Sequence, residues 1–194
     1  MARSAALVDG FVAGNTPVYG VTTGFGSLAS TVIPAERTAE LQVALVRSHA
    51  AGMGDTVEPE VVRAMLFLRA RSLAMAYSGA RPQIAALQLA MLNAGITPVV
   101  REHGSLGASG DLAPLSHCAL ALIGEGEVWA GGDAEPAAAA LEFAGLSPVA
   151  LPATEGLALI NGTQLMTGIA ALALLEAETL ARTADVVAAM SVDA

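Results

Sequence analysis

The stretch Gly104–His117, which reads GSLGASGDLAPLSH, carries the tripeptide Ala108-Ser109-Gly110 at its centre. If the Gly110 amide nitrogen attacks the Ala108 carbonyl carbon, the backbone closes into a ring. Loss of water from that ring and from the Ser109 hydroxyl leaves an electrophilic exocyclic methylene. Glycine suits the attacking position, because it lacks a Cβ and reaches unusual backbone angles. The tripeptide alone fits an ordinary turn before a helix at least as well, so its context decides.

Three further segments stand in a fixed order around this loop: VYGVTTGFG (Val18–Gly26), LVRSHAAGMG (Leu45–Gly54) and EGLALINGTQ (Glu155–Gln164). Together with the loop they resemble the sequence blocks of the aromatic amino acid ammonia-lyase and aminomutase family. Histidine, phenylalanine and tyrosine ammonia-lyases are members of that family. Ordered blocks along nearly the whole chain are far more specific than any single motif.

The resemblance implies that residues 1–194 are the N-terminal portion of a longer lyase domain. Its segments here are a tyrosine loop (17–31), a substrate-ring block (45–54), a prosthetic-group loop (104–118) and an asparagine block (155–164). The resemblance also implies that Ala108, Ser109 and Gly110 form the prosthetic group MIO (4-methylideneimidazole-5-one). The methylene carbon would come from Ser109, and no external cofactor would be needed.

Other site residues follow from the same resemblance. Tyr19 would remove the β-proton of the substrate, and Asn161 would lie beside the prosthetic group. Ser48 and His49 would contact the substrate side chain. A free phenol has a pKa of about 10, so a tyrosine base needs surroundings that lower that value. The structural alternatives are a loop-packing tyrosine, a histidine that caps a helix end, and an Asx turn at Asn161.

The composition favours closely packed helices. Of the 194 residues 54% are hydrophobic but only 4% aromatic, and the mean hydropathy is +0.59. This excess of small apolar side chains predicts burial against other subunits. The segment 156–175 carries no formal charge and is about long enough to span a bilayer. Its Asn161, Thr163 and Gln164 need polar partners, which favours a buried core helix and no membrane partner.

Charge and cysteine content restrict the function further. The net charge is −9 without a basic patch, which argues against nucleic acid as a partner. Residues 111–194 hold eleven acidic residues and one arginine, so a substrate carboxylate needs a cation from elsewhere. Cys118 is the only cysteine and the N-terminus lacks a signal-peptide core, which together favour the cytoplasm. His103 and His117 have no metal-ligand spacing, so no metal site is predicted.

The fold class predicted is mainly α, a helical bundle with an irregular loop around the tripeptide. Helices are expected over residues 2–13, 34–53, 59–77, 82–93, 111–123, 135–144 and 163 to beyond 189. Asp111 is expected as the N-cap of its helix. The segment 96–100 should be extended, and GEGEVWAGGD should form a turn or short hairpin. One departure from the family pattern Asn-x-Leu-x-x-Gly is Arg71 at its first position and Ala76 at its last.

The leading functional hypothesis is an ammonia-lyase that converts L-histidine to urocanate, since Ser48-His49 is the pattern of histidine-type lyases. A tyrosine or phenylalanine ammonia-lyase, or a 2,3-aminomutase, would use the same electrophile. The third alternative is an inactive truncated helical fragment that only self-associates. The resemblance implies a homotetramer for the complete protein, with an aromatic amino acid as substrate.

Overall fold

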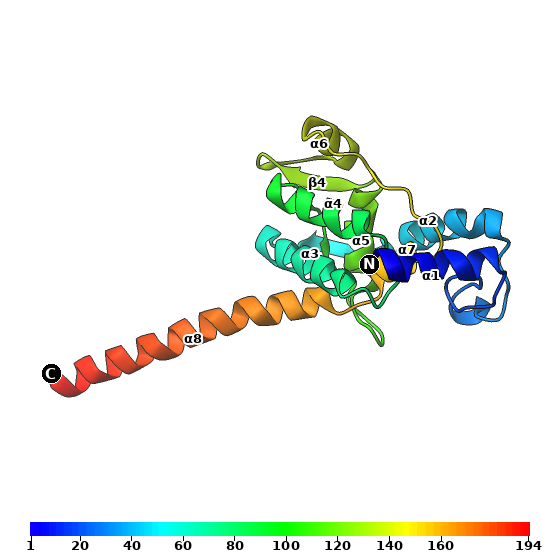
Figure 1. Cartoon of the computed structure of the whole chain (residues 1–194). Helices are drawn as coiled ribbons and strands as arrows, with labels where there is room; N and C mark the ends of the chain where they lie inside the picture. The colour runs from blue at the N-terminus through cyan, green and yellow to red at the C-terminus, as the bar shows by residue number, and fades with distance from the viewer.

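Alanine- and leucine-rich segments form the helices of the computed structural model, which describes residues 1–194 (Figure 1). In chain order they are α1 (Ala2–Ala13), α2 (Thr38–His49), α3 (Pro59–Ala74), α4 (Pro82–Asn93), α5 (Leu112–Leu122), α6 (Ala137–Phe143), α7 (Glu155–Ile160) and α8 (Gln164–Asp193). Two single 3-10 turns are η1 (Gly26–Leu28) and η2 (Ala35–Arg37). The mainly helical fold that the sequence predicts is confirmed.

Several predicted helix ends are wrong. The expected helix 34–53 is a 3-10 turn followed by α2, which ends at His49. The chain then turns into strand β1 (Met53–Thr56). The expected helix 59–77 ends at Ala74, because Ala76 adopts a left-handed backbone with φ +67°. Left-handed backbone costs an alanine energy that a glycine avoids, which gives the departure from the family pattern a structural meaning.

Two small antiparallel sheets connect the helices. β1 pairs with β3 (Arg101–His103), just before the prosthetic-group loop. The second sheet has the strand order β2 (Thr97–Pro98), β4 (Glu127–Ala130), β5 (Asp133–Pro136). Its β4–β5 pair is the hairpin that the sequence predicts.

The core lies between α2, α3, α4, α5 and α7. Among its fully buried large side chains are Met65, Leu66, Leu73, Ile84, Met91, Leu115, Leu122 and Ile160. This packing fixes the ends of α5 and α7 close to α2. The candidate site is formed at those ends.

Helix α8 leaves the body and projects away from it as a long rod (Figure 1). Only Leu165 and Gly168 of this helix are buried, and both lie in its first two turns. By length and composition alone, the segment Glu155–Asp193, which contains α8, is long and apolar enough to cross a membrane. In the structure, 28% of its most apolar stretch of 18 residues is buried. Most of the apolar surface of α8 is therefore uncovered in this chain.

Candidate active site

The loop around Ala108-Ser109-Gly110 is closed on itself. The Leu106 amide donates to the Gly110 carbonyl oxygen at 2.7 Å, and the Ser105 hydroxyl donates to the Asp111 carboxylate at 2.7 Å. Gly110 has φ +86°, in the region that favours glycine. The tripeptide thus lies at the tip of a tight turn, with a glycine at the position whose nitrogen must attack. These residues fit the formation of MIO.

Asp111 occupies the N-cap position of α5, as predicted, but its side chain makes no capping bond there. The fully buried carboxylate instead accepts the amide protons of Leu165 at 2.8 Å and Met166 at 3.2 Å. It therefore caps α8, where the helix dipole favours negative charge. One carboxylate joins the prosthetic-group loop to the start of α8.

Tyr19 lies in an irregular loop, and a threonine of the same loop, Thr22, closes it by hydrogen bonding. The Thr22 hydroxyl oxygen accepts the Val18 amide proton at 2.9 Å. The Tyr19 ring meets Phe25 edge to face, with ring centroids 6.4 Å apart. Its hydroxyl oxygen accepts the Gly26 amide proton at 3.3 Å, and the side chain is 55% exposed. Tyr19 is therefore held in position and accessible, and does not belong to the core.

Ser48 and His49 lie at the C-terminal end of α2. His49 Nδ1 is 2.9 Å from the Leu45 carbonyl oxygen, and the Ser48 hydroxyl donates to the same oxygen at 2.9 Å. Because a carbonyl only accepts, His49 carries its proton on Nδ1 when it makes this bond. Nε2 is then an acceptor. His49 lines the cleft described below, whereas Ser48 does not.

Asn161 ends α7 as its C-cap residue and is exposed. It does not start the long helix, which begins at Gln164 after Thr163. Gln164, a weaker candidate from the same block, accepts a hydrogen bond from Arg69 at 3.1 Å and donates to Ser72 at 3.3 Å. Those hydrogen bonds hold the side chain of Gln164 against α3. Of the two side-chain amides, only that of Asn161 lines the cleft described below.

A cleft of about 470 Å³ brings the predicted residues together. Its polar and aromatic lining includes Tyr19, His49, Ser109 and Asn161, from four separate segments. Ala108, Gly110 and Ser48 do not line it. No arginine or lysine lines the cleft.

Sequence reasoning missed the apolar part of the lining. These side chains are Phe25, Leu45, Leu112, Leu157 and Ile160. Each lies inside one of the four sequence blocks, so the apolar residues of the blocks were the signal that could have found them. They give the cleft an apolar part that suits a flat ring.

His117 and Cys118 belong to α5, the helix that follows the loop. His117 Nε2 accepts the Gly52 amide proton at 3.2 Å, which joins α5 to the segment after α2. Burial, and to a smaller extent Arg101, lowers the pKa of His117. Burial raises the pKa of the Cys118 thiol to about 12, so it stays protonated in the core. No group of three His, Cys, Asp or Glu side chains could hold a metal ion.

A family model described as aromatic amino acid lyase matches residues 1–194. The histidine ammonia-lyase of Streptomyces griseus is 53% identical over 195 residues, a match that covers 100% of this chain and 38% of that protein. The histidine ammonia-lyase of Deinococcus radiodurans is also 53% identical, with 100% and 37% covered. The chain therefore spans well under half the length of these curated relatives.

Solved structures share the fold. Histidine ammonia-lyase from Trypanosoma cruzi has a TM-score of 0.86 and 40% identity, covering 94% of this chain and 35% of that one. Tyrosine aminomutase from Streptomyces globisporus has a TM-score of 0.79 and 43% identity, covering 86% and 31%. The fold around the cleft is that of the N-terminal part of the histidine ammonia-lyase structure.

Proposed function

The chain belongs to the aromatic amino acid lyase family, and on this premise we propose that it supplies one side of the active site of an ammonia-lyase. The reaction removes ammonia from an aromatic L-amino acid, and L-histidine, which gives urocanate, is the substrate we propose. The observation that carries the proposal is the cleft lined by Tyr19, Ser109 and Asn161 beside a loop closed around Ala-Ser-Gly.

The closed loop supports MIO formation in this chain. The hydrogen bonds from Leu106 to Gly110 and from Ser105 to Asp111 span the tripeptide and bring its two flanks together. Compression of this kind favours an intramolecular attack that an open loop rarely reaches. Once formed, MIO would supply an electrophilic methylene for the substrate amino group, and Ala108, Ser109 and Gly110 would hold it in the loop.

The roles of the other residues follow from their places in the cleft. Tyr19 removes the β-proton, and the Gly26 amide that donates to its hydroxyl oxygen holds that oxygen in place. Asn161, with a free side-chain amide, holds the departing amine. His49 offers Nε2 as an acceptor to an N–H or O–H group on the substrate ring, and Ser48 keeps the His49 ring in place.

The second candidate is a tyrosine-specific lyase or aminomutase. An Nε2 acceptor on His49 suits the hydroxyl of a phenol as well as the N–H of an imidazole. The likeness to tyrosine aminomutase at 43% identity also supports this alternative. The two candidates differ in substrate, and an aminomutase would also differ in the fate of the amine. They share every residue assigned above.

The isolated chain is expected to be inactive and to self-associate. No arginine or lysine lines its cleft. We therefore expect the cation that binds the substrate carboxylate to come from another part of the complete protein. The uncovered apolar side chains of α8 supply a surface that copies of the chain can bury together. We propose that the complete protein is a homo-oligomer assembled along this helix.

A chimera tests the proposed function. Residues 1–194 replace the matching segment of the Streptomyces griseus histidine ammonia-lyase, and turnover of L-histidine, L-tyrosine and L-phenylalanine is followed by product identification. We expect urocanate from L-histidine and no product from the Ser109→Ala chimera. A coumarate or a β-amino acid in place of urocanate would favour the second candidate. A folded oligomeric chimera without any turnover would refute the lyase.

A further inference from the structure

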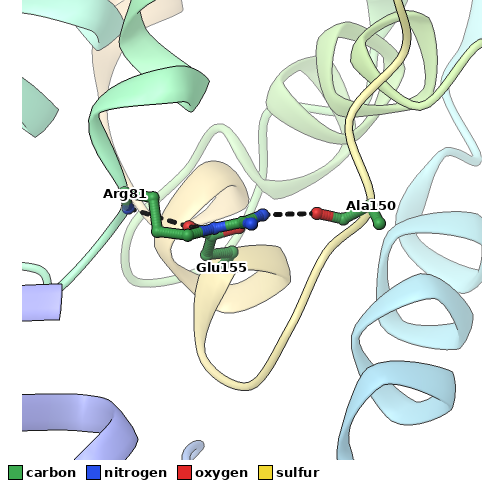
Figure 2. Close-up of polar contacts among 3 residues, drawn as sticks. All are labelled: Arg81, Ala150 and Glu155. Carbon is green, nitrogen blue, oxygen red and sulfur yellow. Dashed lines mark hydrogen bonds and ion pairs between the residues drawn. The ribbon is translucent and has the colours of Figure 1, made fainter. Parts of the chain in front are cut away.

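The buried carboxylate of Glu155, in the first turn of α7, is held by a single arginine (Figure 2). Glu155, with a side chain 2% exposed, accepts from Arg81 in three places. The donors are the backbone N at 2.8 Å, Nε at 2.9 Å and Nη2 at 2.8 Å. Bidentate pairs of this geometry are the most directional ion pairs in proteins, so Glu155 has little freedom to move.

The same arginine holds the segment that leads into α7. Arg81 Nη2 donates to the Ala150 carbonyl oxygen at 2.6 Å, as Figure 2 shows. The guanidinium therefore joins three segments: the start of α4, the connection before α7, and the first turn of α7. Neither Arg81 nor Glu155 lines the cleft, so any effect on the site must pass through α7.

The backbone next to Glu155 is strained. Thr154 has φ +78°, which is unusual for a β-branched residue, and its buried hydroxyl has no hydrogen-bond partner. Its own contacts do not explain the conformation. Such strain persists only where the surroundings fix it, and the ion pair of the next residue, Glu155, is one of the contacts that hold this segment.

Helix α7 also contacts α2 closely, through Gln42. The Leu157 amide donates to Gln42 Oε1 at 3.0 Å, and a Cβ on Gly156 would lie 2.7 Å from the Gln42 carbonyl oxygen. A helix of six residues has little stability of its own. Its orientation is therefore set by these outside contacts, and it carries Leu157, Ile160 and Asn161 to the cleft.

We propose that Arg81 and Glu155 are positioning residues, which set the orientation of α7 and thereby present Asn161 and Leu157 to the cleft. The inference rests on the proposed function for the role of Asn161, whereas the orientation of α7 can be measured without it. Loss of the pair would free α7 at its first turn and let the strained connection relax.

Native-state hydrogen exchange of the chain tests the local part of the proposal. We expect Glu155→Gln to speed exchange of residues 150–161 by about ten-fold or more, with smaller changes in α3 and α5. Arg81→Lys keeps the positive charge but loses the two guanidinium donors to Glu155, so it should give an intermediate increase in the exchange rate of residues 150–161. This variant replaces Glu155→Gln if Glu155→Gln does not fold. The control Glu125→Gln breaks the exposed Arg47–Glu125 pair by the same side-chain change and should leave 150–161 unchanged.

Kinetics of the chimera connect the pair to the site. Glu155→Gln should lower kcat by about ten-fold with a smaller change in KM, because Asn161 acts on the reacting group more than on binding. Equal acceleration of exchange along the whole chain, or no acceleration at 150–161, would overturn the positioning role. A parent chimera without turnover would refute the proposed function and leave the exchange result to decide the orientation of α7.

Discussion

At the scale of single residues, Asp111 has the largest influence on the loop. Its buried carboxylate accepts from Ser105, Leu165 and Met166. We predict that Asp111→Ala lowers the free energy of unfolding by about 3 kcal/mol, since it leaves a hydroxyl and two helix N–H groups without their acceptor. Urea unfolding measures the loss.

An exposed aspartate is the matched control for this change. Asp133 lies on β5 with no side-chain hydrogen bond, so Asp133→Ala should alter the free energy of unfolding by about 0.5 kcal/mol or less. Similar losses in the two variants would mean that Asp111 contributes no capping energy.

Ala76 is a position where the chain can be made more stable. Its left-handed backbone, φ +67°, costs an alanine energy that glycine does not incur. We predict that Ala76→Gly raises the free energy of unfolding by about 1 kcal/mol. Thermal unfolding shows the gain, and Ala74→Gly, inside α3, should have the opposite sign. A loss in both variants would argue against the left-handed conformation.

His117 makes stability depend on pH. Its Nε2 accepts the Gly52 amide proton, so the native structure holds the neutral ring. Because burial lowers the folded pKa below the usual 6.5, the unfolded chain binds the proton more readily. The free energy of unfolding is therefore highest above about 6.5, falls with pH through the folded pKa, and levels off below it.

Urea unfolding across this pH range checks the prediction. His117→Gln should flatten the slope, whereas His103→Gln should keep it, because the His103 side chain is 74% exposed. A slope that survives His117→Gln would assign the pH dependence to other groups.

At the scale of elements, helix starts were easier to predict than helix ends. Pro59 and Pro82 each open a helix, as local preference dictates. The end of α2 depends on the pairing of β1 with β3, whose partner strand lies far along the chain. α7 was not predicted as a separate helix, because six residues give too short a periodic pattern and tertiary contacts hold it.

Helix α8 is the element through which the chain should self-associate. Leu180 is 71% exposed and Val187 55% exposed, and their spacing puts both on one face. We predict that Leu180→Glu with Val187→Glu weakens self-association by about ten-fold or more, because it places charge in the buried surface. Analytical ultracentrifugation measures this.

A glutamate on another exposed helix is the control. Leu7 is 62% exposed on α1, and Leu7→Glu should leave the association constant unchanged. A parent chain that stays monomeric at all concentrations would contradict assembly along α8.

At the scale of the whole molecule, the residues that line the cleft were easier to predict from the sequence than the contacts that hold them in place. Tyr19, His49, Ser109 and Asn161 were identified by resemblance, and they do line one cleft. The capping of α8 by Asp111 joins residues from distant parts of the chain, which no local pattern reveals. Ser48 was assigned together with His49 by the same resemblance, although only His49 reaches the cleft.

We propose that this chain builds its own electrophile within the closed loop. Intact-mass spectrometry of residues 1–194 tests it most directly. We predict a mass that is two waters below that of the sequence, and a Ser109→Ala variant whose mass shows no loss of the Ser109 water. A parent mass that equals the uncyclised sequence would contradict the claim.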